Sequence, residues 1–135
     1  MTEQRISLET AKLAKEVGFN WKVQFYYNHK NTLSDDGANL ANYNQEGLKT
    51  LSAPTQNFLQ KWIREVHNLH IHIDTTPHFD EMESHRSKYK SLVKIPFQSY
   101  KWTTGKYYLG NTYEEVLESG IYEALLLIKT TENDK

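Results

Sequence analysis

Cysteine is absent from the 135-residue sequence. Disulfide bonds, thiolate metal sites and a cysteine nucleophile are therefore excluded, and a reducing compartment is the expected environment. Long hydrophobic runs are absent too, because the longest apolar segment, residues 124–128, is far too short to cross a bilayer. The N-terminal residues are polar and charged, unlike a signal peptide. We therefore expect a soluble, cytoplasmic protein.

Apolar residues and net charge are also in short supply. Apolar residues make up 38% of the chain, below the usual value of about 45–50%. Aromatic residues, at 13%, offset part of this deficit because each ring buries a large area. The length suits one domain, residues 1–135, around one small core rich in rings. The net charge of −1 gives no overall attraction to nucleic acid or membrane, so any polyanion site must be local.

The common catalytic motifs are missing as well. The sequence contains no P-loop, no G-x-G-x-x-G, no G-x-S-x-G and no H-E-x-x-H. Single carboxylates such as Glu46, Asp80 and Glu81 have no pairing that the sequence establishes. The sequence therefore gives no support to an enzyme, and we expect neither a catalytic residue nor a cofactor.

Residues 52–74 form the unit around which the rest of the chain is expected to pack. Ser52 is the predicted N-cap of a helix with Pro54 in its first turn, where a missing N–H costs nothing. A predicted strand follows, with His70, His72 and Asp74 on one side and aliphatic residues on the other. The expected apolar face of the helix consists of Phe58, Leu59, Trp62, Ile63 and Val66.

Helical and strand periods predict further elements on both sides of this unit. Ser7 caps a predicted helix over 8–17, and a strand is expected over 20–27. Residues 28–50 are polar, keep no sustained period and are predicted to form a flexible loop. Strands are expected over 92–102 and 107–109. The T-x-x-E capping box of Thr112 and Glu115 begins a last helix, with Gly120 as a close-packing position and a frayed tail from residue 129. These elements predict an α+β fold, with three helices packed on one face of a small, mostly antiparallel sheet of three or four strands.

Three blocks of the sequence resemble a family of short uncharacterised bacteriophage and prophage proteins. The blocks are residues 9–19, 53–71 and 111–125, about a third of the chain. The resemblance implies an accessory protein that acts in the cytoplasm of the host cell. It implies no reaction, and it carries over no site residues.

A histidine-rich segment is the first candidate for chemistry. His70 and His72 share one strand face, about 7 Å apart along the chain, a spacing that metal sites use. Asp74, His78 or Asp80 could supply a third ligand, and His67 lies nearby in the sequence. A metal-dependent hydrolase would need three such ligands and an open water position. The exposed polar face of a strand explains the same pattern without metal.

A local excess of lysine and aromatic residues is the second candidate. From Ser84 to Tyr113 the chain has no Asp or Glu. Lysines interleaved with rings suit an anionic ligand, because ammonium groups neutralise phosphate and rings stack on bases. A sheet edge protected by lysine gives the same composition without a ligand. The predicted ligand-binding residues are Lys94, Tyr100, Lys101, Trp102, Lys106 and Tyr107.

Together these features predict a phage-type accessory protein without catalytic activity. Its expected ligand is an anion, either a nucleotide signal or a nucleic acid, or else a host protein, in a role that counters host defence. The alternatives are a metal-dependent hydrolase that uses the histidine segment, and an inhibitor or adaptor that acts only through protein contacts. Exposed Tyr and Trp side chains, common at interfaces, also suggest a homo-oligomer. No membrane partner is expected.

Overall fold

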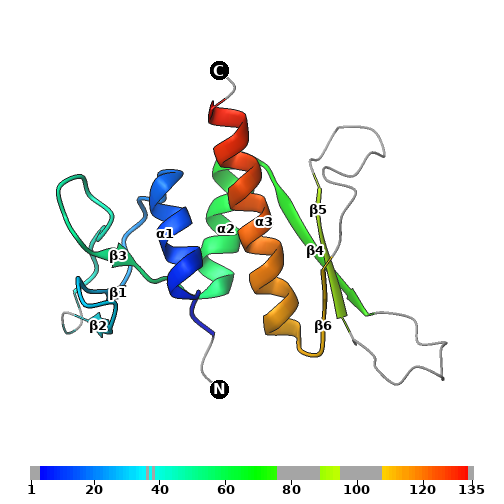
Figure 1. Ribbon diagram of the computed structural model, residues 1–135, viewed down its shortest axis with the longest axis horizontal. Coiled ribbons are helices and arrows are strands. Elements are labelled where there is room, and N and C mark those ends of the chain that lie inside the picture. Colours follow the sequence, from blue (N-terminus) through cyan, green and yellow to red (C-terminus); the bar gives the residue numbers. More distant parts are fainter. Residues whose placement is uncertain (1–3, 36, 38, 76–88, 95–107, 134–135) are drawn as a thin grey trace.

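The computed structural model describes residues 4–35, 37, 39–75, 89–94 and 108–133. Three helices lie between two separate three-stranded antiparallel sheets, of order β2-β1-β3 and β4-β5-β6 (Figure 1). The predicted α+β class is confirmed, but the prediction of one sheet is wrong. The elements are α1 (Leu8–Glu16), β1 (Phe25–Tyr27), β2 (Leu33–Asp35), β3 (Leu51–Ser52), α2 (Gln56–His67), β4 (His70–Thr75), β5 (Tyr89–Lys94), β6 (Tyr108–Gly110) and α3 (Tyr113–Asn133).

The extra sheet comes from the segment that was predicted to be a loop. Residues 28–50 contain β2, which pairs with β1, and Ala41 forms an isolated antiparallel bridge with Val23. The predicted strand over 20–27 is thus reduced to its last three residues. Side chains hold this short-stranded sheet together: Ser52 Oγ accepts from the Tyr43 N–H at 3.1 Å, and Asn44 Oδ1 accepts from the Ser52 N–H at 2.9 Å. Such bonds between segments leave no period in the sequence.

The helix starts follow from local capping. Ser7 Oγ accepts from the Thr10 N–H at the start of α1, as predicted. The capping box of α3 is also present, since the Glu115 N–H donates to Thr112 Oγ1 at 3.1 Å and the Thr112 N–H donates to Glu115 Oε2 at 3.2 Å. The N-cap of α2, however, is Thr55, whose Oγ1 accepts from the Phe58 N–H. Ser52 is buried in β3 instead, which corrects the predicted cap.

Two further helix predictions need correction. Helix α3 continues to Asn133, so the tail is helical well beyond residue 129; the ion pair between Lys129 Nζ and Glu16 Oε2, at 2.7 Å, ties this part to α1. Val66 is 51% exposed and does not belong to the buried face of α2. Phe58 packs against the core only in part.

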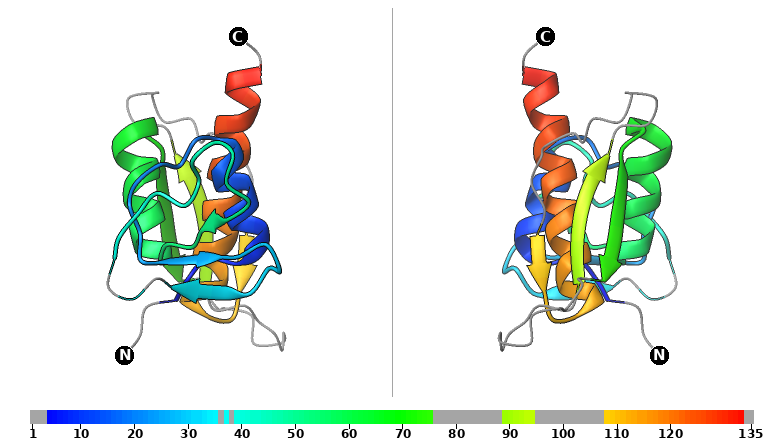
Figure 2. Two further views of the ribbon diagram at one scale, coloured as in Figure 1. Left: turned by 90° about the vertical axis from the view of Figure 1, so that its left-hand side faces the viewer. Right: turned by 90° about the vertical axis from the view of Figure 1, so that its right-hand side faces the viewer.

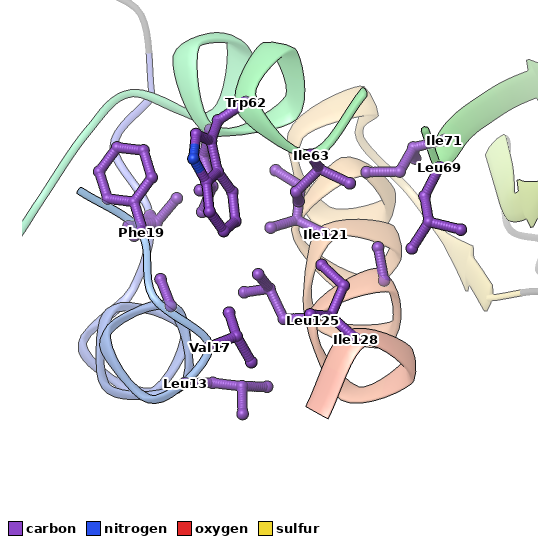
Figure 3. Close-up of a cluster of buried hydrophobic side chains, with 14 of the residues drawn as sticks. Leu13, Val17, Phe19, Trp62, Ile63, Leu69, Ile71, Ile121, Leu125 and Ile128 are labelled. Atoms are coloured by element: carbon purple, nitrogen blue, oxygen red, sulfur yellow. The ribbon is translucent and has the colours of Figure 1, made fainter. Parts of the chain in front are cut away.

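One hydrophobic cluster joins the helices to the inner side of the β4-β5-β6 sheet. Trp62 of α2 packs edge to face on Phe19, with ring centroids 5.3 Å apart, and both side chains are buried. Ile121 and Leu125 of α3 are fully buried beside Ile63 (Figure 3). The core therefore lies between α1, α2, α3 and the second sheet.

Candidate functional site

The β4-β5-β6 sheet has two unlike faces, because successive side chains of a strand point to opposite sides. Ile71 pairs with Val93, and both are buried toward the helices. The neighbouring pairs His70–Lys94 and Asp74–Lys90 point away from the helices. This side is turned toward the viewer in the right-hand view of Figure 2. We call it the outer face; it consists of His70, His72, Asp74, Lys90, Leu92, Lys94 and Leu109.

The outer face brings together the two groups of residues that the sequence singled out separately. The predicted ligand-binding residue Lys94, the last residue of β5, lies directly across from His70. His72 is next along β4, and its side chain is 49% exposed. Cross-strand neighbours on one face lie about 4.5–5.5 Å apart between Cβ atoms. An ammonium group and two imidazoles therefore share one small area of the sheet.

The other end of the outer face carries a carboxylate. Asp74 lies directly across from Lys90, and its carboxylate Oδ2 is 3.9 Å from His72 Nε2. The Asp74 side chain is 59% exposed, so solvent screens its charge and the pairing contributes little to stability. The face is thus graded in charge, from cationic at Lys94 to mixed at Lys90 and Asp74.

The remaining predicted ligand-binding residues are Tyr100, Lys101, Trp102, Lys106 and Tyr107, which lie outside the described residues. The predicted strand over 92–102 begins three residues earlier, at Tyr89, and is described only as far as Lys94. The predicted strand over 107–109 corresponds to β6. Sequence periodicity placed Lys94 on the correct side of the sheet, but it could not show that β4 would be the neighbour of β5.

The histidine segment does not form a three-ligand metal site within the described ranges. His70, His72 and Asp74 share the outer face, but no group of three His, Asp or Glu side chains there is arranged to hold a metal ion. His67 points elsewhere, with its ring edge to face against Trp62 at 4.8 Å. His78 and Asp80 lie outside the described residues. The metal-site hypothesis therefore rests on ligands that are not described.

Sequence reasoning missed a polar cleft beside α3. Its two parts, of about 310 and 790 Å³, share Ser7, Glu118 and Ser119. The Glu118 carboxylate accepts from the Ser7 N–H at 2.9 Å, from the Thr10 hydroxyl and from the Gln56 amide at 2.8 Å. One carboxylate thereby joins α1, α2 and α3. Its partners are 62 to 111 residues away in the sequence, so no local pattern could have found it.

Two tyrosines near this cleft have shifted pKa values. Burial raises the pKa of Tyr27, the Glu118 carboxylate raises it further, and Arg5 opposes the shift. The Tyr27 hydroxyl donates to the Ile6 carbonyl at 2.8 Å. The hydrogen bond from Tyr108 to Glu123 Oε1, at 2.6 Å, raises the pKa of Tyr108 to about 12. Both hydroxyls stay protonated at neutral pH and act as structural donors.

Comparison with models of protein families, with curated proteins and with solved structures gives no match for this chain. Among the described helices, none combines the length and the apolar character that a membrane span requires.

Proposed function

We propose that this protein is a non-enzymatic binding protein that holds an anionic ligand, a nucleotide or a nucleic acid, on the outer face of the β4-β5-β6 sheet. The observation that carries the proposal is the register that sets His70 across from Lys94, with His72 beside them. An ammonium group neutralises phosphate and imidazole N–H groups donate hydrogen bonds to it, so this combination on one face of the sheet suits a phosphate ligand.

The composition of the segment that contains β5 and β6 supports the same ligand class. The sequence between residues 84 and 113, which contains β5 and β6, has no Asp or Glu. Asp74 is the one carboxylate among the outer-face residues, and it lies at the end away from Lys94. Local positive charge raises the concentration and on-rate of an anion even when the net charge of the protein is near zero.

The resemblance to phage proteins suggests where such binding would be used. In this proposal the protein is a phage accessory factor that captures a nucleotide signal or nucleic acid in the host cytoplasm and so counters host defence. Binding to a host protein is the alternative use of the same surface, and self-association through exposed rings is compatible with either.

The experiment compares Lys94→Glu, alone and together with Trp102→Ala, with Lys12→Glu. Lys12 is exposed on α1, and α1 and the β4-β5-β6 sheet lie on opposite sides of α3 (Figure 1). Titration with nucleotides and oligonucleotides should show that the changes at Lys94 and Trp102 abolish binding while the Lys12 variant binds as the parent does. Thermal unfolding should be nearly unchanged in all three. Unchanged affinity of the double variant would sink the proposal.

Native mass spectrometry of protein purified from an expressing host provides an independent check. A carried-over nucleotide or oligonucleotide supports the proposal. Stoichiometric metal in protein prepared without chelator would favour the hydrolase alternative and would overturn the proposal of a non-enzymatic binding protein.

A further inference from the structure

We infer that the outer face takes single-stranded nucleic acid in preference to a mononucleotide. This inference rests on the proposed function and specifies its ligand. It follows from how the cations and the imidazoles are distributed along two neighbouring strands.

The lysines of the outer face are spread out along the sheet. Lys90 and Lys94 project from the same side of β5, four residues apart, which corresponds to about 13 Å along an antiparallel strand. Because the two side chains leave the strand that far apart, each can contact a different phosphate of an extended ligand. Sites for small ligands instead gather a few polar groups around a concave pocket. The spacing therefore suits a ligand with several phosphates along its length.

The imidazoles of β4 add a second row beside the lysines. His70 and His72 project from one side of the strand about 7 Å apart, and both side chains are exposed. Histidine rings stack on unpaired bases in single-stranded recognition. Bases in a duplex are already stacked and paired, so these rings could reach them only in a single strand. A row of rings next to a row of cations is the arrangement that binds single strands with little sequence preference.

The carboxylate of Asp74 gives the binding face a direction. It lies across from Lys90 and beside His72, so it weakens the attraction of phosphate to Lys90 relative to Lys94. Replacing Asp74 with Asn keeps the shape and removes the charge. Affinity for the oligonucleotide should then rise a few-fold, a gain that a poorly folded variant cannot imitate.

The test uses oligothymidylates of one to six nucleotides and measures binding by fluorescence anisotropy at several salt concentrations. Affinity should increase at least tenfold between one and four nucleotides, and a duplex of the same length should bind more weakly. Each phosphate contact to a single strand contributes about −0.7 to the slope of log K against log salt concentration. Lys94→Ala should therefore make the slope shallower by about 0.7, whereas Lys12→Ala should leave it unchanged.

A second variant pair tests stacking separately from charge. At pH 8, His72→Ala should lower oligonucleotide affinity about tenfold through lost stacking without changing the salt slope. His29→Ala is the matched control, because His29 is exposed in the turn between β1 and β2.

The outcomes separate this inference from the proposed function. If thymidine monophosphate binds as tightly as the longer strands, or the duplex binds as tightly as the single strand, the inference is overturned while anion binding stands. If neither nucleotides nor oligonucleotides bind in a manner that depends on Lys94, both are overturned.

Discussion

The two faces of the β4-β5-β6 sheet are built from alternating residues of the same strands, yet they differ in almost every property. Ile71, Ser91 and Val93 face α3 and are buried, whereas His70, His72 and Lys94 face away from the helices. The inner face holds the fold together through aliphatic contact with α3. The outer face contributes little to that contact. Residues of the outer face can therefore be substituted to suit a ligand with little effect on the packing of the inner face.

The largest expected contrast is between two neighbouring residues, Val93 and Leu92. Val93 is 2% exposed on the inner face, and Leu92 is half-buried on the outer face. Val93→Lys puts a charge into the core and should lower the free energy of unfolding by about 4 kcal/mol or more. Leu92→Lys should cost less than about 1 kcal/mol. Urea unfolding of both variants measures the difference, and similar losses would show that the two faces do not differ as described.

A smaller loss of stability is expected at Gly120, where α3 approaches the inner face. A Cβ at this position would lie 2.6 Å from Ile71 Cγ2 and 3.3 Å from Ser91 Cβ. Gly120→Ala should thus destabilise the protein by about 1–3 kcal/mol through overpacking, despite a gain of about 1 kcal/mol in helix propensity.

The companion variant for Gly120 is Ile71→Ala, which removes the clashing methyl group. Combined with Gly120→Ala, it should cost less than the sum of the two single changes, because the two side chains compete for one space. Additive losses in urea unfolding would contradict the close approach of α3 to β4.

The third prediction concerns Tyr108, which anchors the short edge strand β6 to Glu123 of α3. Tyr108→Phe should lower stability near pH 8 by about 1 kcal/mol, the net value of one hydrogen bond. The folded pKa is about 12, above the ordinary value of about 10, so folding favours the protonated phenol. This contribution is complete below pH 10 and is lost as the pH rises from 10 toward 12.

The measurement for Tyr108 is the difference in unfolding free energy between parent and variant from pH 8 to pH 11. That difference should shrink above pH 10. Tyr122→Phe, at an exposed position of α3, is the control and should give a difference near zero throughout. A Tyr108 difference that stays constant with pH would contradict the bond to Glu123.

Local patterns predicted much of this fold because caps and periods act over a few residues. Ser7, the box of Thr112 and Glu115, and the alternation from Leu69 to Asp74 all appear as expected. The first sheet was missed because its strands are two or three residues long and depend on bonds between distant segments, such as Tyr43 to Ser52. Ser52 lies in β3 and its Oγ accepts from the Tyr43 N–H, whereas Thr55 directly precedes Gln56 and caps α2.

The candidate site was predictable only one strand at a time. Alternation placed His70 and His72 on one side of their strand and Lys94 on one side of another. Their meeting on one face depends on the register of β4 against β5, and no pattern within either strand specifies a register between strands. The hydrogen bonds to the Glu118 carboxylate could not be predicted from the sequence either, since its three partners come from other parts of the chain.

The smallest expected effect concerns a buried hydroxyl group on the inner face. Ser91 is fully buried against Gly120, and its Oγ has no hydrogen-bond partner among the described residues. A buried hydroxyl without a partner keeps its desolvation cost, so Ser91→Ala should be neutral or should raise stability by up to about 1 kcal/mol. Ser52 is the matched control: it is equally buried, but its Oγ accepts from the Tyr43 N–H. Ser52→Ala should therefore lower stability by about 1 kcal/mol in the same urea titration. A loss at Ser91 as large as that at Ser52 would mean that the Ser91 hydroxyl is hydrogen-bonded, and the inner face would then owe part of its stability to a polar contact.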